Sequence, residues 1–369
     1  MAAKPIASPI PGPDAFTGRS RDAWLSQAAI VLSIGVAAGG EADRVDDPAA
    51  VGLPADLADL GRRDPIPVEE AAEPLGADIA THLSDRSLRL PPSTGAELMA
   101  RVVDQPEPVT AAALVEANLH SESRLVRTSA AVAALDTTGP RDDLLAQLVE
   151  GASRGDALTR EIGRIGVARV DPQHPVLRAV VGRPSRLTGT DRPSHTAVLT
   201  HGTFAALTRW WQPGGDFYLY LDSLVPPLKL HDPSFRWTGL YSDGARQLAA
   251  QQMADWVIDQ DLQQPDVFAH SHGGTVANLA THRGMGIDRL VLLSWPVHGE
   301  WFPDFAEVQR IIDVRVSLDL VVLADRGGQT FTPPPGHAHK VTSHVNGWFD
   351  HSDTHEPAYW DRHGLAAVL

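Results

Sequence analysis

Hydrophobic residues recur three and four positions apart from Glu97 to about Leu177, and this spacing predicts a series of amphipathic helices. Short turn signals rich in Ser, Asp, Gly and Pro separate these helices, so we expect them to form antiparallel pairs. The four clearest segments are AAALVEANL (111–119), RLVRTSAAVAAL (124–135), DDLLAQLVEGA (142–152) and ALTREIGRIGVARV (157–170).

The pattern changes after GRPSRLTGTDRPSH (182–195), which has the composition of a linker. Beyond it, short apolar runs alternate with helical stretches, and this alternation predicts an α/β fold in which helices wrap a mostly parallel sheet. The predicted strands are 196–200, 235–240, 266–269, 288–294, 314–318 and an alternating run around His344. The predicted helices are 244–258, 274–282, 305–312 and one that opens at Pro357.

These patterns divide the chain into parts. Residues 1–22 carry four prolines with little periodicity and are predicted to be a flexible leader. Residues 23–182 form the predicted helical N-terminal region, and residues 41–95 within it are acidic and interrupted by proline. Residues 190–369 form the predicted α/β domain. The helices at 124–135 and 157–170 loosely resemble the second helices of two HEAT-type units, with an ordinary helical bundle as the alternative.

Charge and composition exclude several classes of function. The formal net charge of -15 argues against nucleic acid and anionic membrane surfaces as partners, because phosphates bind clustered Lys and Arg. The absence of cysteine excludes disulfides, thiol nucleophiles and thiolate metal sites. The apolar run from Trp24 to Gly40 has a composition similar to that of a signal peptide but is too short to span a bilayer comfortably. We predict a buried helix here, no integral membrane segment and a cytoplasmic protein, with export as the alternative.

The stretch VFAHSHGGTVANLA (267–280) carries the clearest chemical signal. Ser271 stands between an apolar strand and a helix that opens with glycines. A sharp strand-to-helix turn exposes such a hydroxyl, and the N–H groups at the start of the helix are suited to a developing oxyanion. The turn requires small residues two positions before and after the serine, and Ala269 and Gly273 meet this need. The alternative is a serine that only caps the helix.

This stretch resembles the nucleophile elbow of the α/β-hydrolase superfamily, in particular its lipase and esterase branches. The family pattern is G-x-S-x-G, and the chain departs from it with Ala269 at the first position. The stretch AVLTHGTFA (197–205) resembles the family's oxyanion loop, in which an early strand ends in His-Gly. The resemblance implies an α/β-hydrolase fold, with the backbone N–H groups of Thr203 and His272 as the oxyanion hole.

The family order places an acid and then a histidine after the serine. VRVSLDLVVLAD offers Asp319 and Asp325, and we prefer Asp319 because it directly follows a strand, with Asp325 in reserve. Among the later histidines His344 falls inside the predicted last strand, which disfavours it. We prefer His351, which precedes the helix at Pro357 by a short loop, and keep His355 as the alternate.

These residues together predict a serine hydrolase that cleaves small-molecule or lipid esters without a cofactor or metal. An acyltransferase or amidase with the same triad is one alternative. Another is a non-catalytic binding protein with a decayed hydrolase domain, and the helical region is in either case a candidate surface for a protein partner. The aromatic stretch 208–228 is a candidate lid. His337, His339 and His344 raise the option of a metal site, for which adventitious binding is the preferred explanation.

Overall fold

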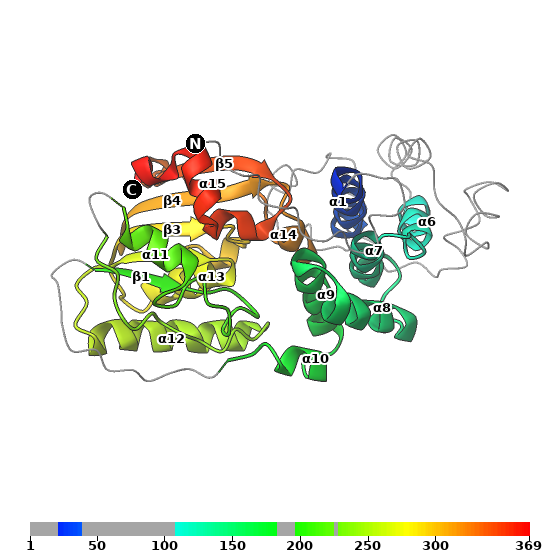
Figure 1. Cartoon of the computed structure of the whole chain (residues 1–369), viewed down its shortest axis with the longest axis horizontal. Helices are drawn as coiled ribbons and strands as arrows, with labels where there is room; N and C mark the ends of the chain where they lie inside the picture. Colours follow the sequence, from blue (N-terminus) through cyan, green and yellow to red (C-terminus); the bar gives the residue numbers. More distant parts are fainter. Residues whose placement is uncertain (1–20, 39–107, 183–195, 225–227) are drawn as a thin grey trace, which may run out of the picture.

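The computed structural model describes residues 21–38, 108–182, 196–224 and 228–369 (Figure 1). A helical N-terminal region precedes a five-stranded sheet in which all strands run parallel, so an α/β fold after a helical region is confirmed. The acidic stretch 41–95 lies outside the described residues, as do the leader up to residue 20 and the linker from residue 183.

The helices predicted from the three-and-four spacing are confirmed. In the helix at 142–154, the buried residues Leu144, Leu148 and Ala152 lie on one stripe, as an amphipathic helix requires. Helix α6 packs against α7, and α8 against α9, which confirms the expected pairing. Such pairs are common to HEAT units and to bundles, and the repeat stays a prediction. The helices of this region are α1 (Arg21–Ala38), α6 (Pro108–Asn118), α7 (Arg124–Thr137), α8 (Asp142–Arg154), α9 (Ala157–Val170) and α10 (Pro175–Arg178).

The apolar run near the start of the chain forms α1, and its side chains belong to the core. Leu32 and Ile34 are fully buried, and α1 packs mainly against α7. Burial of this helix removes its apolar surface from water, which stabilises the folded region. Among the described residues, no helix is both long and apolar enough to cross a membrane.

The sheet has the strand order β1-β2-β3-β4-β5, with every neighbouring pair parallel. Parallel strands place their carboxyl ends at one edge, so the loops that follow them meet there. Along the chain, α12 lies between β1 and β2, and α13 lies between β2 and β3, as expected from the alternating pattern. The strands are β1 (Ala197–Thr200), β2 (Asp266–His270), β3 (Ile287–Leu293), β4 (Val308–Ser317) and β5 (Val341–Trp348).

Both faces of the sheet are covered. Val198, Val267 and Leu292 share one buried cluster with residues of α12 and α13. Their neighbours along the strands point to the opposite face and pack with residues of α11 and α15. Burial on both faces explains why β1, β2 and the end of β3 are apolar runs, whereas β5 has several exposed residues. The remaining bounds are α11 (Asp216–Asp222), α12 (Asp243–Asp259), α13 (His272–Thr281), α14 (Leu320–Ala324) and α15 (Pro357–His363), with short 3₁₀-helices η6 (Gly299–Trp301), η7 (Ala338–Lys340), η8 (His351–His355) and η9 (Leu365–Val368).

Two element predictions were wrong. The segment 235–240 has no regular secondary structure and pairs with no strand of the described sheet. Its polar groups bind loops instead. The Trp237 indole N–H donates to the carbonyl of His201 at 2.7 Å, and the carbonyl of Gly239 accepts from Phe204 N at 2.9 Å. The predicted helix 305–312 is mostly the start of β4, which is buried on both faces from Ile311 onward. Gln309 and Arg310 are exposed and separate Val308 from Ile311, which gives the apolar residues of this segment a helical spacing.

Helix α14 joins the two parts of the molecule. Its five residues are all buried, and Leu320, Val321 and Leu323 belong to the same apolar cluster as α1, α7 and α9. The carboxylate of Asp136, on α7, forms ion pairs with Arg169 of α9 and with Arg326, just after α14. The helical region therefore packs against the edge of the sheet that carries the strand carboxyl ends (Figure 1).

Candidate active site

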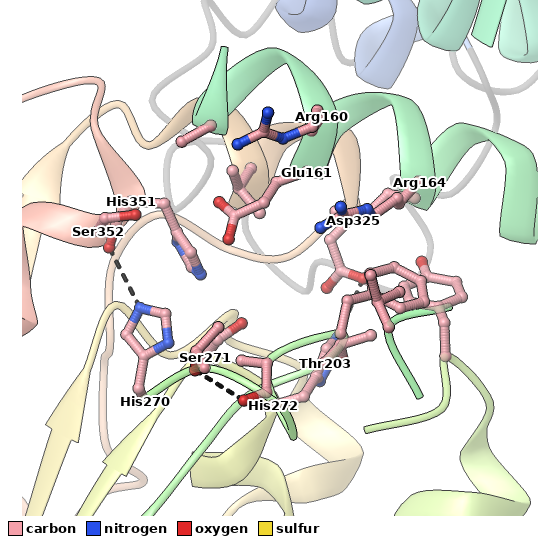
Figure 2. A pocket seen from close by; sticks show the side chains of 18 of the residues that line it. Arg160, Glu161, Arg164, Thr203, His270, Ser271, His272, Asp325, His351 and Ser352 are labelled. Atoms are coloured by element: carbon pink, nitrogen blue, oxygen red, sulfur yellow. Dashed lines mark hydrogen bonds and ion pairs between the residues drawn. The ribbon is translucent and has the colours of Figure 1, made fainter. Parts of the chain in front are cut away.

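Ser271 lies at the sharp turn between β2 and α13. Its backbone has φ +52° and ψ -134°, a conformation in the left-handed region that L-residues rarely adopt. Such strain is retained where the surrounding structure fixes it, commonly at functional sites. The side chain faces a pocket of about 520 Å³ and is 7% exposed (Figure 2).

The turn is closely surrounded by backbone, which explains the small residues of the motif. A Cβ at Gly273 would lie 2.6 Å from the carbonyl oxygen of His201, and a Cβ at Gly202 would lie 2.6 Å from the Cβ of Ser271. Both separations are shorter than any real Cβ contact, so larger residues would displace the serine. The expectation of a crowded turn at Gly273 is confirmed.

A buried hydrogen bond joins two more of the predicted residues. His351 Nδ1 donates to Asp319 Oδ2 at 2.7 Å, and both side chains are about 3% exposed. Asp319 caps the N-terminus of α14, where its Oδ1 accepts from the backbone N–H groups of Val321 and Val322. The carboxylate is therefore held in place from one side by a helix and directs its other oxygen at the imidazole.

The environment of His351 favours the imidazolium. Burial by itself would lower the pKa of His351, but the charge of Asp319 and its hydrogen bond outweigh burial and raise that pKa to about 9. His270 supports the loop from below, because its Nε2–H donates to the backbone carbonyl of His351 at 3.2 Å. Burial, followed by the charges of His351 and His355, holds the pKa of His270 well below its usual range, so this ring is neutral.

Ser271 and His351 line the same pocket, and no hydrogen bond joins Ser271 Oγ to the imidazole in the structure. Hydrogen bonds of this kind are commonly long in unliganded enzymes and tighten when substrate binds. Figure 2 shows the two side chains facing one another across the floor of the pocket. The arrangement is suited to a proton transfer from the hydroxyl to the ring.

The two predicted oxyanion donors lie beside Ser271. His272 is the first residue of α13, and the N–H at this position has no acceptor within its own helix. Thr203 lines the pocket in the loop after β1. That loop is held by the bond from Phe204 N to the carbonyl of Gly239 and by the indole of Trp237 on His201. The chain segments that carry the two predicted donors therefore border the same pocket as Ser271.

The reserve acid Asp325 belongs to a different network. Its Oδ1 binds His272 Nε2 at 3.0 Å, and its Oδ2 binds His298 Nε2 at 3.1 Å, so it does not contact His351. Burial would raise the pKa of Asp325, but His272 and His298 hold it well below its usual range. The alternate His355 stacks on Trp210 at a centroid distance of 4.1 Å and makes no bond to Asp319. Burial, aided by His351, lowers the pKa of His355 to about 3.

His272, His298 and Asp325 are also the group best placed to hold a metal ion among the described residues. Their ligand atoms lie within 4.8 Å of one another. The same atoms already satisfy each other by hydrogen bonds, so the cluster is complete without an ion. The histidines singled out from the sequence are apart from it: His337 stacks on Phe305, and His344 lies within β5.

The candidate lid contributes to the pocket through a few residues only. Thr208 and Trp210 line it, whereas Trp211 is buried and donates its indole N–H to the carbonyl of Ala205. The later part of this stretch forms α11, which packs on the sheet. Residues 225–227 lie outside the described residues.

Sequence reasoning missed the wall that the helical region supplies. Ala157, Arg160, Glu161, Arg164 and Ile165 of α9 line the pocket opposite Ser271. No local motif marks these residues, because a helix more than 100 positions earlier reaches the site only through the packing on α14. His270 was also missed, although its place beside the serine in AHSHG was a signal that could have drawn attention to it.

Comparison with known proteins does not assign this site to a family. A scan against protein-family models, a search of curated proteins and a search of solved structures each found no match to the chain.

Proposed function

We propose that the protein is a serine hydrolase of the α/β-hydrolase superfamily that cleaves carboxylic esters through an acyl-enzyme on Ser271. The observation that carries the proposal is the meeting of a strained serine turn and a buried His351–Asp319 pair in one pocket. A serine that only capped α13 would not require this strain, and its side chain makes no capping hydrogen bond.

The geometry supports a two-step acyl transfer. Neutral His351 takes the proton of Ser271 as the oxygen attacks the carbonyl carbon, and Asp319 stabilises the imidazolium that results. The N–H groups of Thr203 and His272 bind the oxyanion. The imidazolium then gives its proton to the departing alcohol. Water attacks the acyl-enzyme in the second step, with His351 again as the base, and releases the acid and the free serine.

The order of the elements supports the superfamily assignment. The serine follows a central strand, the acid follows β4, and the histidine follows β5, the last strand of the described sheet. Parallel strands bring these three loops to one edge of the sheet, where the family's triads lie. The apolar residues Phe204, Val321 and Val322 in the pocket are suited to the acyl chain of a small-molecule or lipid ester.

The proposal is tested by labelling with a fluorophosphonate probe, read by intact mass. Such probes react with an activated serine and spare ordinary ones. We expect one adduct on the wild type, one adduct on the control Ser153→Ala, which changes an exposed serine of α8, and none on Ser271→Ala. Ser271→Ala should also lose ester turnover by about 10³-fold or more while keeping the wild-type circular dichroism spectrum.

An adduct that persists in Ser271→Ala, or one that peptide mapping places on another serine, would remove Ser271 from the mechanism. A folded wild type that neither reacts with the probe nor hydrolyses 4-nitrophenyl esters would favour a binding protein with an inactive hydrolase domain.

A further inference from the structure

Glu161 has no part in the acyl transfer proposed above, although it lies inside the same pocket. Figure 2 shows its side chain extending from α9 toward His351 and Ser271. Its Oε2 is buried and has no hydrogen-bond partner. A buried acceptor without a partner is costly, and native proteins retain few of them, so its position in a binding pocket indicates a ligand that completes it.

The cations of the same helix do not pair with Glu161. The guanidinium of Arg160 donates to the carbonyl of Gly155 at 3.2 Å, near the start of α9. Arg164 follows one turn after Glu161, yet no ion pair joins the two, and its Nε is buried without a partner. The carboxylate therefore stays available to a group that enters from the pocket.

The surroundings of Glu161 are acidic. Burial raises the pKa of Glu161, and among charged groups His351 acts on it most strongly, followed by the carboxylates of Asp350 and Asp319 and then by Arg164. Burial, followed by the charge of Asp350, also raises the pKa of Asp353 to about 6. A corner with several carboxylates and one shared imidazole favours a positively charged ligand.

The position beside His351 indicates which part of the substrate reaches Glu161. The imidazolium hands its proton to the leaving group, so the departing alcohol lies on the histidine side of the pocket. Phe204, Val321 and Val322 also line the pocket and supply apolar surface for the acyl part. The pocket thus combines an acidic group near His351 with apolar surface.

We propose that Glu161 binds an ammonium group on the leaving-group side of the substrate, which makes the substrate a carboxylic ester of an amino alcohol. This inference rests on the proposed ester hydrolysis. An ammonium N–H donates a charge-assisted hydrogen bond to the unpaired Oε2, and such bonds are about twice as strong as neutral ones. Binding of the cation also offsets the repulsion among the neighbouring carboxylates.

A matched pair of esters tests the inference. 2-(Dimethylamino)ethyl butanoate and 3-methylbutyl butanoate have the same acyl chain and nearly the same shape, and only the first carries a protonated amine near neutral pH. We expect the wild type to have a kcat/KM about tenfold or more higher for the amine ester. Glu161→Gln should remove this preference, so that the ratio of kcat/KM between the two esters falls to about one.

Glu150→Gln, the same change on α8 outside the pocket, is the control and should keep the preference. The inference is overturned if Glu161→Gln keeps the preference, or if the wild type has none. It is also overturned if 3-hydroxypropyl butanoate is favoured over the amine ester, because hydroxyl donors would then be the ligands.

The same measurements distinguish a failure of this inference from a failure of the proposed ester hydrolysis on which it rests. Gln is nearly isosteric with Glu and removes a buried unpaired charge, so the variant should fold. A wild-type circular dichroism spectrum and one fluorophosphonate adduct on Ser271 would verify this. A labelled, ester-cleaving wild type without amine preference overturns the inference alone. A wild type that is neither labelled nor active overturns both.

Discussion

At the scale of single residues, the partner of each histidine near Ser271 decides its protonation. His351 has a carboxylate at 2.7 Å on Nδ1, and its pKa is raised to about 9. His270 binds only a carbonyl and is neutral. Burial and then Arg246 lower the pKa of His272 to about 4, in spite of its bond to Asp325. Of these three, only His351 combines a place in the pocket with a carboxylate that raises its pKa.

Substitution of the two candidate acids separates their roles. Asp319→Asn should lower kcat by about 10³-fold or more, because the amide no longer stabilises the imidazolium and favours the wrong tautomer of His351. Asp325→Asn should cost less than about tenfold, because Asp325 contacts His272 and His298 instead. Steady-state kinetics of both variants on one ester make the comparison. A larger loss at Asp325 would reverse the assignment.

The pH dependence follows from the raised pKa of His351. Only the neutral ring accepts the serine proton, and the ring is protonated below a pH of about 9, so kcat/KM should rise about tenfold per pH unit up to that value and then level off. Glu161→Gln should move the rise to lower pH, because the charge of Glu161 helps to raise the pKa of His351.

The profile is measured on a neutral ester from about pH 6 to 10, with subtraction of spontaneous hydrolysis. A midpoint near the ordinary histidine value of about 6.5 would mean that Asp319 does not hold the imidazolium as the geometry indicates.

At the scale of elements, α14 connects the candidate site to the apolar core of the helical region. Its N-cap is Asp319, and the side chains that follow lie in the apolar cluster shared with the helical region. The orientation of the acid therefore depends on contacts made by α1, α7 and α9. A short helix of five residues has little stability of its own, so these contacts hold it in place.

Shortening one side chain of α14 tests this coupling between the helix and the apolar cluster. Leu323 is 1% exposed in the shared cluster, and Leu323→Ala should lower the free energy of unfolding by about 3 kcal/mol, from lost burial and the cavity that remains. The control Leu248→Ala changes an exposed residue of α12 and should cost less than about 0.5 kcal/mol. Urea unfolding followed by circular dichroism gives both values. Equal midpoints for the two variants would mean that α14 does not join the regions energetically.

At the scale of the whole molecule, the helical region and the sheet enclose the pocket together. The sheet edge and its loops provide Ser271, Asp319 and His351, and α9 provides the facing wall with Glu161. In the proposed function, chemistry and recognition are thus divided between two parts of the chain. The helical region, which the sequence suggested as a surface for a partner, has one of its faces turned to the site itself.

The sequence determined those features that depend on neighbours along the chain. The helices between 108 and 170 follow from apolar spacing, and the serine turn follows from a strand, small flanking residues and a glycine-rich helix start. The acid and the histidine could be narrowed to pairs because the resemblance implies that they follow the serine in that order, in loops after later strands. Local pattern was insufficient at 305–312, where the exposed pair Gln309 and Arg310 between Val308 and Ile311 gives a strand the apolar spacing of a helix.

Only the tertiary structure decided which candidate acid contacts which candidate histidine. Asp319 and Asp325 stand at opposite ends of the same short helix, and its orientation directs the first to His351 and the second to His272. Glu161 carries no signal in its own segment, and its place beside the serine arises from packing between regions far apart in the sequence. Such contacts depend on the summed burial of many apolar side chains, and no short stretch of the sequence encodes that sum.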